Sequence, residues 1–181
     1  ALCGLLALLL ALPVVGVLIA LDSPGPIFYR QERLGYRGKK FAIYKFRSMR
    51  LDAEREGRAA WTSEHDPRIT GIGRFMRATH LDELPQVLNV LRGEMSVIGP
   101  RPEREEFVKE LEKTVPFYRC RLMVKPGLSG WAQVKYHYGR SDYDALVKLQ
   151  YDLYYIKHQS FLLDVFILLK TVGEVFSLNG A

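Results

Sequence analysis

The first 21 residues form an apolar segment that carries no charged side chain. As a helix this segment is just long enough to cross a bilayer, which takes about 20 residues. Pro13 lies near its middle, where it removes a backbone hydrogen bond and predicts a kink. A kinked apolar helix can span a membrane, or it can enter and leave on the same face. The alternative is a buried helix of a soluble core.

Basic residues follow the apolar segment closely. The cations between residues 30 and 50 are Arg30, Arg33, Arg37, Lys39, Lys40, Lys45, Arg47 and Arg50. Positive residues beside an apolar helix mark the cytoplasmic side of a membrane, so this flank favours the membrane helix. The net charge of +6 over 181 residues suits anionic partners, such as a lipid surface, a phosphorylated substrate or nucleic acid.

The rest of the chain predicts one α+β domain. Aromatic and branched residues on both sides of a glycine-containing turn predict a β-hairpin over residues 27–33 and 40–47. Lys45 and Arg47 are two residues apart, so they leave the same face of its second strand. Helices are expected over residues 52–58, 72–78, 79–91, 102–114, 142–157 and 161–176, and loops over residues 61–70 and 115–130. The last helix is apolar enough for either the core or a membrane interface.

Two adjacent carboxylates, Asp82 and Glu83, mark the candidate site. Thr79 stands three residues before Asp82, in the pattern that opens a helix. Neighbouring helical residues project about 100° apart, so the two carboxylates suit separate tasks better than a shared proton. One can stand at the reacting atom and the other toward a metal or water, while a helix N-terminus favours a phosphate. The alternative is that both carboxylates only cap the helix.

Cations surround this acidic pair in the sequence. Arg101 lies between Pro100 and Pro102, which restrict its backbone, and arginine binds phosphate oxygens in a bidentate manner. Other cations that could converge on the same anion are Lys45, Arg47, Arg77, Arg119, Arg121 and Lys125. Carboxylates beside such cations predict Mg²⁺-assisted chemistry on a phosphate, with Asp82 and Glu83 as the candidate metal ligands.

In this order, the motifs resemble the catalytic domain of the bacterial sugar transferases, the monotopic polyprenyl-phosphate phosphoglycosyl transferases. The resemblance covers nearly the whole chain. Besides the proline-broken apolar helix, it rests on SPGPIF at 23–28, YKFRSM at 44–49, LDELPQ at 81–86, IGPRP at 98–102, KPGLSGWAQV at 125–134 and YDLYY at 151–155.

The resemblance implies a reaction in which a sugar 1-phosphate passes from a UDP-sugar to a polyprenyl phosphate, with release of UMP. It implies that Asp82 is the nucleophile of a covalent phosphosugar intermediate, that Glu83 completes the acidic dyad, and that Mg²⁺ is required. It associates Lys125 and Gly127 with a nucleotide-binding loop, although a plain turn explains the glycines equally well. Asp152 falls in a family motif and has either a site role or a structural one. A hexose donor is favoured.

The fold that follows is a helix-rich monotopic membrane domain. Residues 1–21 form a proline-kinked re-entrant helix, and residues 22–181 form a catalytic domain, one structural unit with that helix, containing the β-hairpin and amphipathic interfacial helices. The expected location is the cytoplasmic face of the bacterial inner membrane, with inner-membrane lipid as a partner. The sequence leaves open whether the chain forms a homodimer. Nucleic acid is the weakest candidate partner because no recognition motif is present.

Two alternatives remain open at this point. In the first, the substrates are the same, but Asp82 acts as a general base for direct attack by the lipid phosphate. In the second, the chain is a non-catalytic, membrane-anchored module that binds anions.

Overall fold

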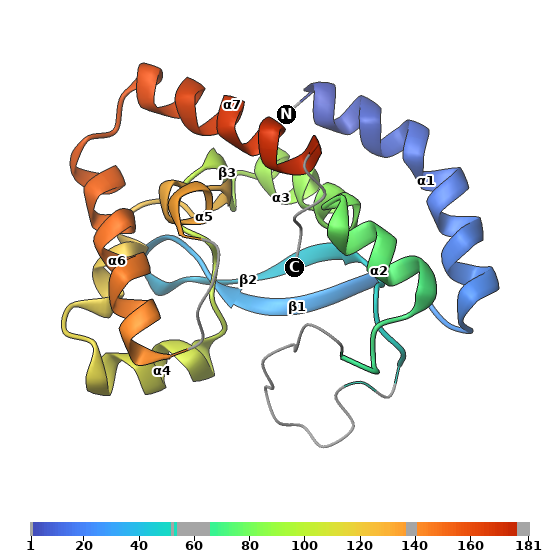
Figure 1. Cartoon of the computed structure of the whole chain (residues 1–181), viewed down its shortest axis with the longest axis horizontal. Helices are drawn as coiled ribbons and strands as arrows, with labels where there is room; N and C mark the ends of the chain where they lie inside the picture. Colours follow the sequence, from blue (N-terminus) through green and yellow to red (C-terminus); the bar gives the residue numbers. More distant parts are fainter. Residues whose placement is uncertain (1, 52, 54–65, 137–140, 177–181) are drawn as a thin grey trace.

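The structure is a computed structural model that describes residues 2–51, 53, 66–136 and 141–176, with side chains up to residue 174. It confirms the predicted mixture of helices and small sheets (Figure 1). The elements in chain order are α1 (Leu2–Asp22), β1 (Phe28–Leu34), the 3₁₀ helix η1 (Tyr36–Gly38), β2 (Lys40–Phe46), α2 (Gly71–Ala78), η2 (Leu81–Gln86), α3 (Val87–Leu91), β3 (Ser96–Ile98), α4 (Glu105–Thr114), η3 (Tyr118–Met123), β4 (Gly127–Ser129), α5 (Trp131–Lys135), α6 (Asp142–Lys157) and α7 (Phe161–Phe176). Two of the predicted elements fall largely outside the described residues. The helix predicted over residues 52–58 is described only at residue 53, and the loop predicted over residues 61–70 is described only from residue 66.

Helix α1 is continuous, with Pro13 inside it. Its mean hydropathy is 2.8 over an 18-residue window, and only 22% of that window is buried. A core helix of a soluble protein would bury most of its apolar surface, so these values favour a helix in contact with lipid. The kink at Pro13 and the re-entrant course of α1 both stay predictions.

The buried face of α1 packs into the same core as the elements that follow it. Leu8, Val15 and Ile19 of α1 share a cluster with Phe46 of β2 and Val87 of α3. Helix α1 is therefore fixed against the hairpin and the η2–α3 segment by the burial of apolar side chains, which is the main favourable contribution to folding.

The predicted β-hairpin is confirmed, with ends within one residue of those expected. Strands β1 and β2 are antiparallel, and their register pairs Phe28 with Phe46 and Leu34 with Lys40. Arg47 follows β2 directly and donates hydrogen bonds to the carbonyls of Pro24 (2.7 Å) and Ser23 (2.5 Å). These bonds join the end of the hairpin to the segment where α1 ends.

The predicted helix start at Thr79 is wrong. The Thr79 hydroxyl donates backward to the carbonyls of Phe75 (2.9 Å) and Met76 (3.2 Å), so it closes α2 instead of opening the next helix. His80 follows with a left-handed φ of 56° and separates α2 from η2. Threonine can bond to carbonyls three or four residues earlier, and in this sequence that local partner replaces the expected cap.

The loop predicted over residues 115–130 contains two elements, η3 and strand β4. Strand β4 pairs in parallel with β3, and the two backbones are very close. A Cβ atom on Gly127 would lie 2.1 Å from the backbone nitrogen of Gly99. Strands of three residues are too short to show a periodic pattern, so this sheet could not be predicted from the sequence.

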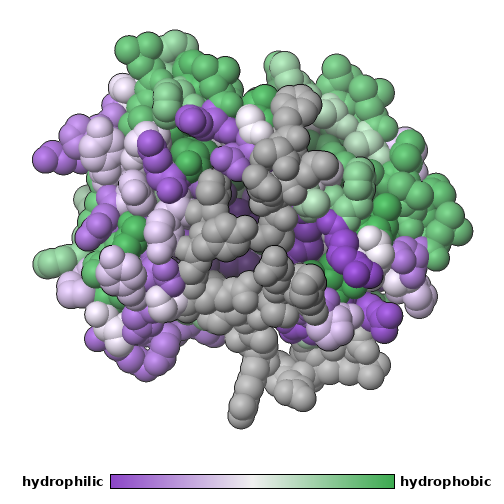
Figure 2. All heavy atoms as spheres, viewed as in Figure 1, coloured by the Kyte–Doolittle hydropathy of each residue, from purple (hydrophilic) through white to green (hydrophobic). Residues whose placement is uncertain are grey.

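Apolar side chains gather on one edge of the molecule, over α1 and α7 (Figure 2). Helix α7 buries Ile167 completely but leaves Phe161 (81%), Leu162 (78%) and Leu169 (67%) exposed. This division favours an amphipathic helix at a membrane interface over the core helix that the sequence also allowed.

The close approach of β3 and β4 predicts an asymmetry between two glycine substitutions. Gly127→Ala should lower the free energy of unfolding by about 1–3 kcal/mol, because the added methyl group forces the two backbones apart. The matched control is Gly173→Ala in α7, where a Cβ atom meets nothing within 4 Å, and this change should be neutral or stabilising. Thermal unfolding of the detergent-purified variants measures both, and equal melting temperatures would contradict the packing described.

Candidate active site

The acidic pair lies in η2, which packs against β2. Residues in a 3₁₀ helix repeat every three positions, so adjacent side chains diverge by about 120°. Asp82 and Glu83 therefore have different surroundings, as the sequence predicted from their adjacency. Both side chains are largely buried.

Glu83 is held by cations from two separate elements. Its Oε1 accepts hydrogen bonds from Lys45 Nζ of β2 (2.6 Å) and from Arg101 Nη2, which follows β3 (2.6 Å). Its Oε2 accepts a weaker bond from Arg101 Nη1 (3.3 Å). Burial acts to raise the pKa of Glu83, but Arg101 and Lys45 together outweigh it and hold that pKa well below its usual range. Glu83 is therefore a fixed anion.

Asp82 has the opposite environment. Its exposed fraction is 6%, and no described residue donates a hydrogen bond to its carboxylate. Burial raises the pKa of Asp82, Lys45 opposes this, and the neighbouring Glu83 raises it further. Arg77 of α2 and Arg101 add to the opposing effect. The result is a poorly solvated carboxylate among cations, with its lone pairs available to a reacting group.

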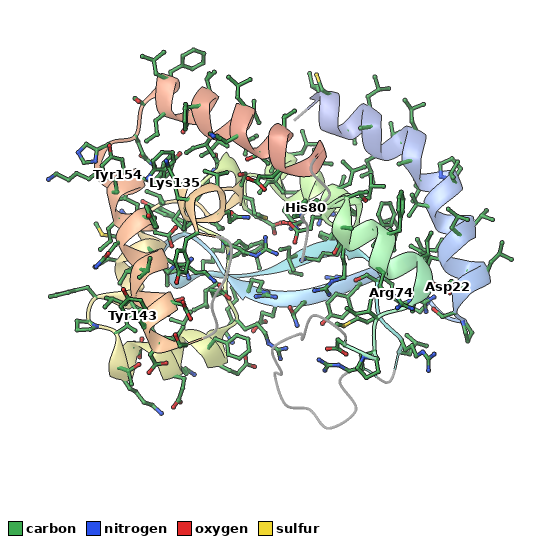
Figure 3. All side chains as sticks on the ribbon, in the orientation of Figure 1. Asp22, Arg74, His80, Lys135, Tyr143 and Tyr154 are labelled. Carbon is green, nitrogen blue, oxygen red and sulfur yellow. The ribbon has the colours of Figure 1, made fainter. Side chains whose placement is uncertain are left out.

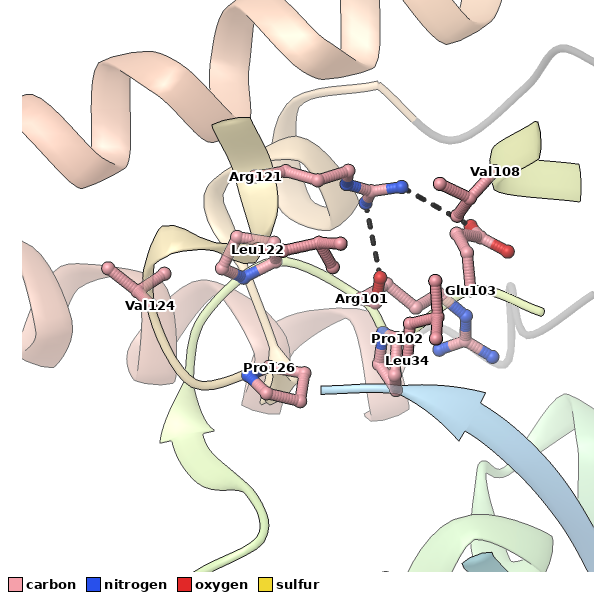
Figure 4. Close-up of a pocket in the computed structure, with 10 residues that line it drawn as sticks. Leu34, Arg101, Pro102, Glu103, Val108, Arg121, Leu122, Val124 and Pro126 are labelled. Atoms are coloured by element: carbon pink, nitrogen blue, oxygen red, sulfur yellow. Dashed lines mark hydrogen bonds and ion pairs between the residues drawn. The ribbon is translucent and has the colours of Figure 1, made fainter. Parts of the chain in front are cut away.

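A buried ion pair holds the main chain of Arg101 in place. Arg121 of η3 donates from Nη2 to the main-chain carbonyl of Arg101 (3.1 Å) and forms an ion pair with Asp152 of α6 (2.8 Å). Figure 4 shows the Arg121 guanidinium directed at that carbonyl and at Glu103, which is 3.8 Å away. Arg33 of β1 donates to the next carbonyl, that of Pro102 (3.3 Å). These contacts fix the backbone from which the Arg101 side chain reaches Glu83.

The structure thus brings together Lys45, Arg77 and Arg101 around the acidic pair. It places Arg121 and Asp152 in a supporting layer, since each side chain is at most 7% exposed and they partner each other. The substrate-binding roles predicted for these two residues stay predictions.

Other candidate residues lie elsewhere. Arg47 is bonded to the carbonyls of Ile19 in the last turn of α1 and of Pro24 just after it, and Gly127 is needed for the β3–β4 contact. Lys125 is exposed, with its ammonium group near Gly93. Arg119 pairs with Glu112 of α4. No described side-chain contact joins any of these four residues to Asp82 or Glu83.

Sequence reasoning missed Asn89, which is fully buried in α3. Its side chain accepts a hydrogen bond from the Tyr44 main-chain nitrogen (3.1 Å) and donates one to the carbonyl of Ala42 (2.7 Å). These bonds fix β2 on α3 and so set the position of Lys45. The signal available in the sequence was a single amide within an apolar run.

The acidic pair fits a magnesium ion only in the manner typical of phosphate-transferring sites. Among the described residues, no group of three or more His, Cys, Asp or Glu side chains could hold a metal. Mg²⁺ commonly uses one or two carboxylates together with substrate phosphates and water. Asp82 has both oxygens available, and three donors leave Glu83 one of its roughly four lone-pair sites, on Oε2.

The Arg121–Asp152 pair predicts a large stability effect. Asp152→Asn should lower the free energy of unfolding by about 2–3 kcal/mol, because it removes the nearer carboxylate partner of the buried Arg121 and leaves only the more distant Glu103 (3.8 Å). Glu110→Gln in α4 removes a carboxylate from an exposed ion pair with Lys113 and should have little effect. Denaturant unfolding of the two variants makes the comparison, and equal midpoints would show that the buried pair does not support the fold.

The amino-acid sequence is similar to a family model and to several curated proteins. The family model for bacterial sugar transferases matches residues 1–178. The chain is 44% identical to the UDP-N-acetylgalactosamine-undecaprenyl-phosphate N-acetylgalactosaminephosphotransferase of Aeromonas hydrophila, over 98% of this chain and 43% of that protein. It is 42% identical to the UDP-glucose:undecaprenyl-phosphate glucose-1-phosphate transferase of Xanthomonas campestris pv. campestris, over 100% of this chain and 37% of that protein.

The transferase of the same name from Escherichia coli (strain K12) is 40% identical, over 94% of this chain and 38% of that protein. The chain thus spans about two fifths of the length of these three curated relatives. Because the family model covers nearly every residue and the identities are high, the chain belongs to the bacterial sugar transferase family.

Proposed function

We propose that the chain transfers a sugar 1-phosphate from a UDP-sugar to a polyprenyl phosphate at the cytoplasmic face of the bacterial inner membrane. One observation carries the proposal: Asp82 is a buried carboxylate without a hydrogen-bond donor among the described residues, next to cations gathered by Glu83. The names of the relatives, which include glucose and N-acetylgalactosamine transferases acting with undecaprenyl phosphate, support the same reaction class.

In the first step, a carboxylate oxygen of Asp82 attacks the phosphorus that bears the sugar. The bond from that phosphorus to the oxygen bridging the two phosphates breaks, and UMP leaves with the bridging oxygen. The product is a mixed anhydride between Asp82 and the sugar phosphate. An anionic nucleophile and an anionic diphosphate repel each other, and Lys45, Arg77 and Arg101 offset this repulsion.

In the second step, an oxygen of the polyprenyl phosphate attacks the same phosphorus. The bond from phosphorus to Asp82 breaks, which restores the carboxylate and gives the polyprenyl diphosphate sugar. The two half-reactions use one site in turn, so ping-pong kinetics are expected. Glu83 takes part by holding Lys45 and Arg101 in place. Mg²⁺ bound by Asp82 and Glu83 would supply further neutralisation of the diphosphate charge.

The proposed mechanism predicts a covalent adduct on Asp82. Incubation of the detergent-purified protein with Mg²⁺ and a panel of UDP-sugars, without lipid acceptor, should add the mass of one sugar phosphate, and the donor that gives the adduct identifies the sugar. Asp82→Asn should show no adduct, because an amide is a far weaker nucleophile. Asp142→Asn, at an exposed position that begins α6, is the matched control and should behave as wild type.

The same measurement separates the alternatives. If no adduct forms but UMP is released once polyprenyl phosphate is added, Asp82 acts as a general base for direct attack, a role for which its raised pKa is also suitable. If neither adduct nor UMP is found with any donor, the transferase proposal fails and a membrane-anchored anion-binding module takes its place.

The proposed mechanism also predicts how the rate of adduct formation depends on pH. Adduct formation needs ionised Asp82, so its rate should fall as the pH falls through the Asp82 pKa, which burial places above its usual value. Glu83 stays ionised over this range because its pKa is lowered. Lys45→Met removes a cation that lowers the Asp82 pKa, so the acidic limb should move to higher pH. Lys39→Met, at an exposed position in the hairpin turn, is the control and should leave the limb in place. An unmoved limb in the Lys45 variant would contradict this electrostatic assignment.

A further inference from the structure

A polar cavity of about 240 Å³ lies where α1 ends and α2 begins, separate from the acidic pair. Its lining includes Asp22, Arg50, Asp66, Thr70 and Arg74. Figure 3 shows Asp22 and Arg74 close together at this junction. The volume far exceeds what one water molecule needs, so the cavity has room for a larger polar group.

The carboxylates of this cavity are already engaged by the protein. Asp22 Oδ2 accepts a hydrogen bond from the main-chain nitrogen of Ile72 in the first turn of α2 (2.8 Å). This backbone bond is the largest cause that lowers the Asp22 pKa, and the Thr70 side chain adds to it. Asp66 binds the Arg68 guanidinium through both carboxylate oxygens, at 2.6 and 2.8 Å. The charge of Asp66 is thus neutralised by Arg68, whereas Asp22 remains an anion that the charges of Arg50 and Arg47 stabilise.

The arginines of the cavity, unlike its carboxylates, have no side-chain hydrogen-bond partner among the described residues. Arg50 and Arg74 are both exposed, and neither forms a hydrogen bond or ion pair through its side chain with a described residue. Each guanidinium has five N–H donors in a planar array that matches two phosphate oxygens. The two guanidinium groups outweigh the single negative charge of Asp22, so the cavity offers donors and net positive charge to an anion.

The position of the cavity indicates which anions reach it. Each of three lining residues has a large, exposed apolar residue next to it in the chain: Leu21 (79%) precedes Asp22, Leu51 (64%) follows Arg50, and Phe75 (57%) follows Arg74. The cavity is also at the end of α1, the apolar helix. Where such a helix leaves the hydrocarbon, the polar residues that follow lie at the level of the lipid headgroups.

We propose that Arg50 and Arg74 bind the phosphate group of a membrane lipid in this cavity. The apolar neighbours contact the chains of the lipid, while the two guanidinium groups hold its phosphate. An anionic phospholipid and the polyprenyl phosphate substrate share this chemistry. The inference rests on the part of the proposed function that places α1 in the membrane, but not on the transfer reaction.

Lipid binding is measured by native mass spectrometry of the full chain in detergent, without sugar donor. The probes are phosphatidylglycerol, a polyprenyl phosphate and the corresponding polyprenol, which lacks the phosphate. The test variant is Arg50→Gln/Arg74→Gln. The control, Lys39→Gln/Lys113→Gln, removes two charges from exposed positions on the hairpin turn and α4. Both variants are first checked for wild-type melting temperature.

The test variant should bind phosphate-bearing lipid on the order of tenfold more weakly than wild type, because each basic residue near a membrane surface contributes appreciably to anionic lipid binding. The control variant should bind as wild type, and polyprenol binding should be the same in all three proteins. Weakening for phosphatidylglycerol identifies a headgroup site, whereas weakening for polyprenyl phosphate alone identifies an acceptor site.

Equal binding by wild type and the test variant would overturn the proposal. So would equal weakening in the control, because it would show a general effect of net charge. The readout involves no UDP-sugar, so a failed transferase assay and a failed lipid-binding assay remain distinct results.

Discussion

Glu83 is the residue on which the candidate site depends. Its carboxylate satisfies two cations, Lys45 from the hairpin and Arg101 from the segment after β3, which would otherwise repel each other across the site. A largely buried anion of this kind is costly to desolvate and is stable only while both partners remain in place. With the cations fixed by Glu83, the adjacent Asp82 can remain without a hydrogen-bond donor among the described residues and still be ionised.

The position of each cation depends in turn on buried polar groups. Arg121 and Asp152, on η3 and α6, hold the main chain of Arg101 through a carbonyl contact. Asn89 holds β2, and therefore Lys45, against α3. Buried polar groups that satisfy one another fix a single arrangement, because every alternative leaves a donor or acceptor unpaired. The geometry of the site thus also depends on side chains that do not touch the acidic pair.

The apolar helix is part of the same arrangement. Its buried face shares a core cluster with β2, α2 and α3, and Arg47 bonds to the segment where the helix ends. The position of the acidic pair relative to α1 is therefore set by rigid packing rather than by a flexible linker. In the proposed reaction, this coupling lets a soluble nucleotide sugar and a lipid phosphate meet at one carboxylate.

The sequence by itself determined the features that depend on local patterns. The apolar segment, the hairpin and the two long helices near the C-terminus could be predicted with nearly correct ends, because side-chain periodicity and turn residues act over a few neighbours. The acidic pair and its need for cations were also visible. Only the tertiary structure decided that Lys45 and Arg101 meet Glu83 while Arg47 bonds to the end of α1, since equal charges in a sequence do not reveal which are brought together. The tertiary structure likewise decided the β3–β4 pairing, because contacts between three-residue strands about 30 positions apart leave no local periodic signal in the sequence.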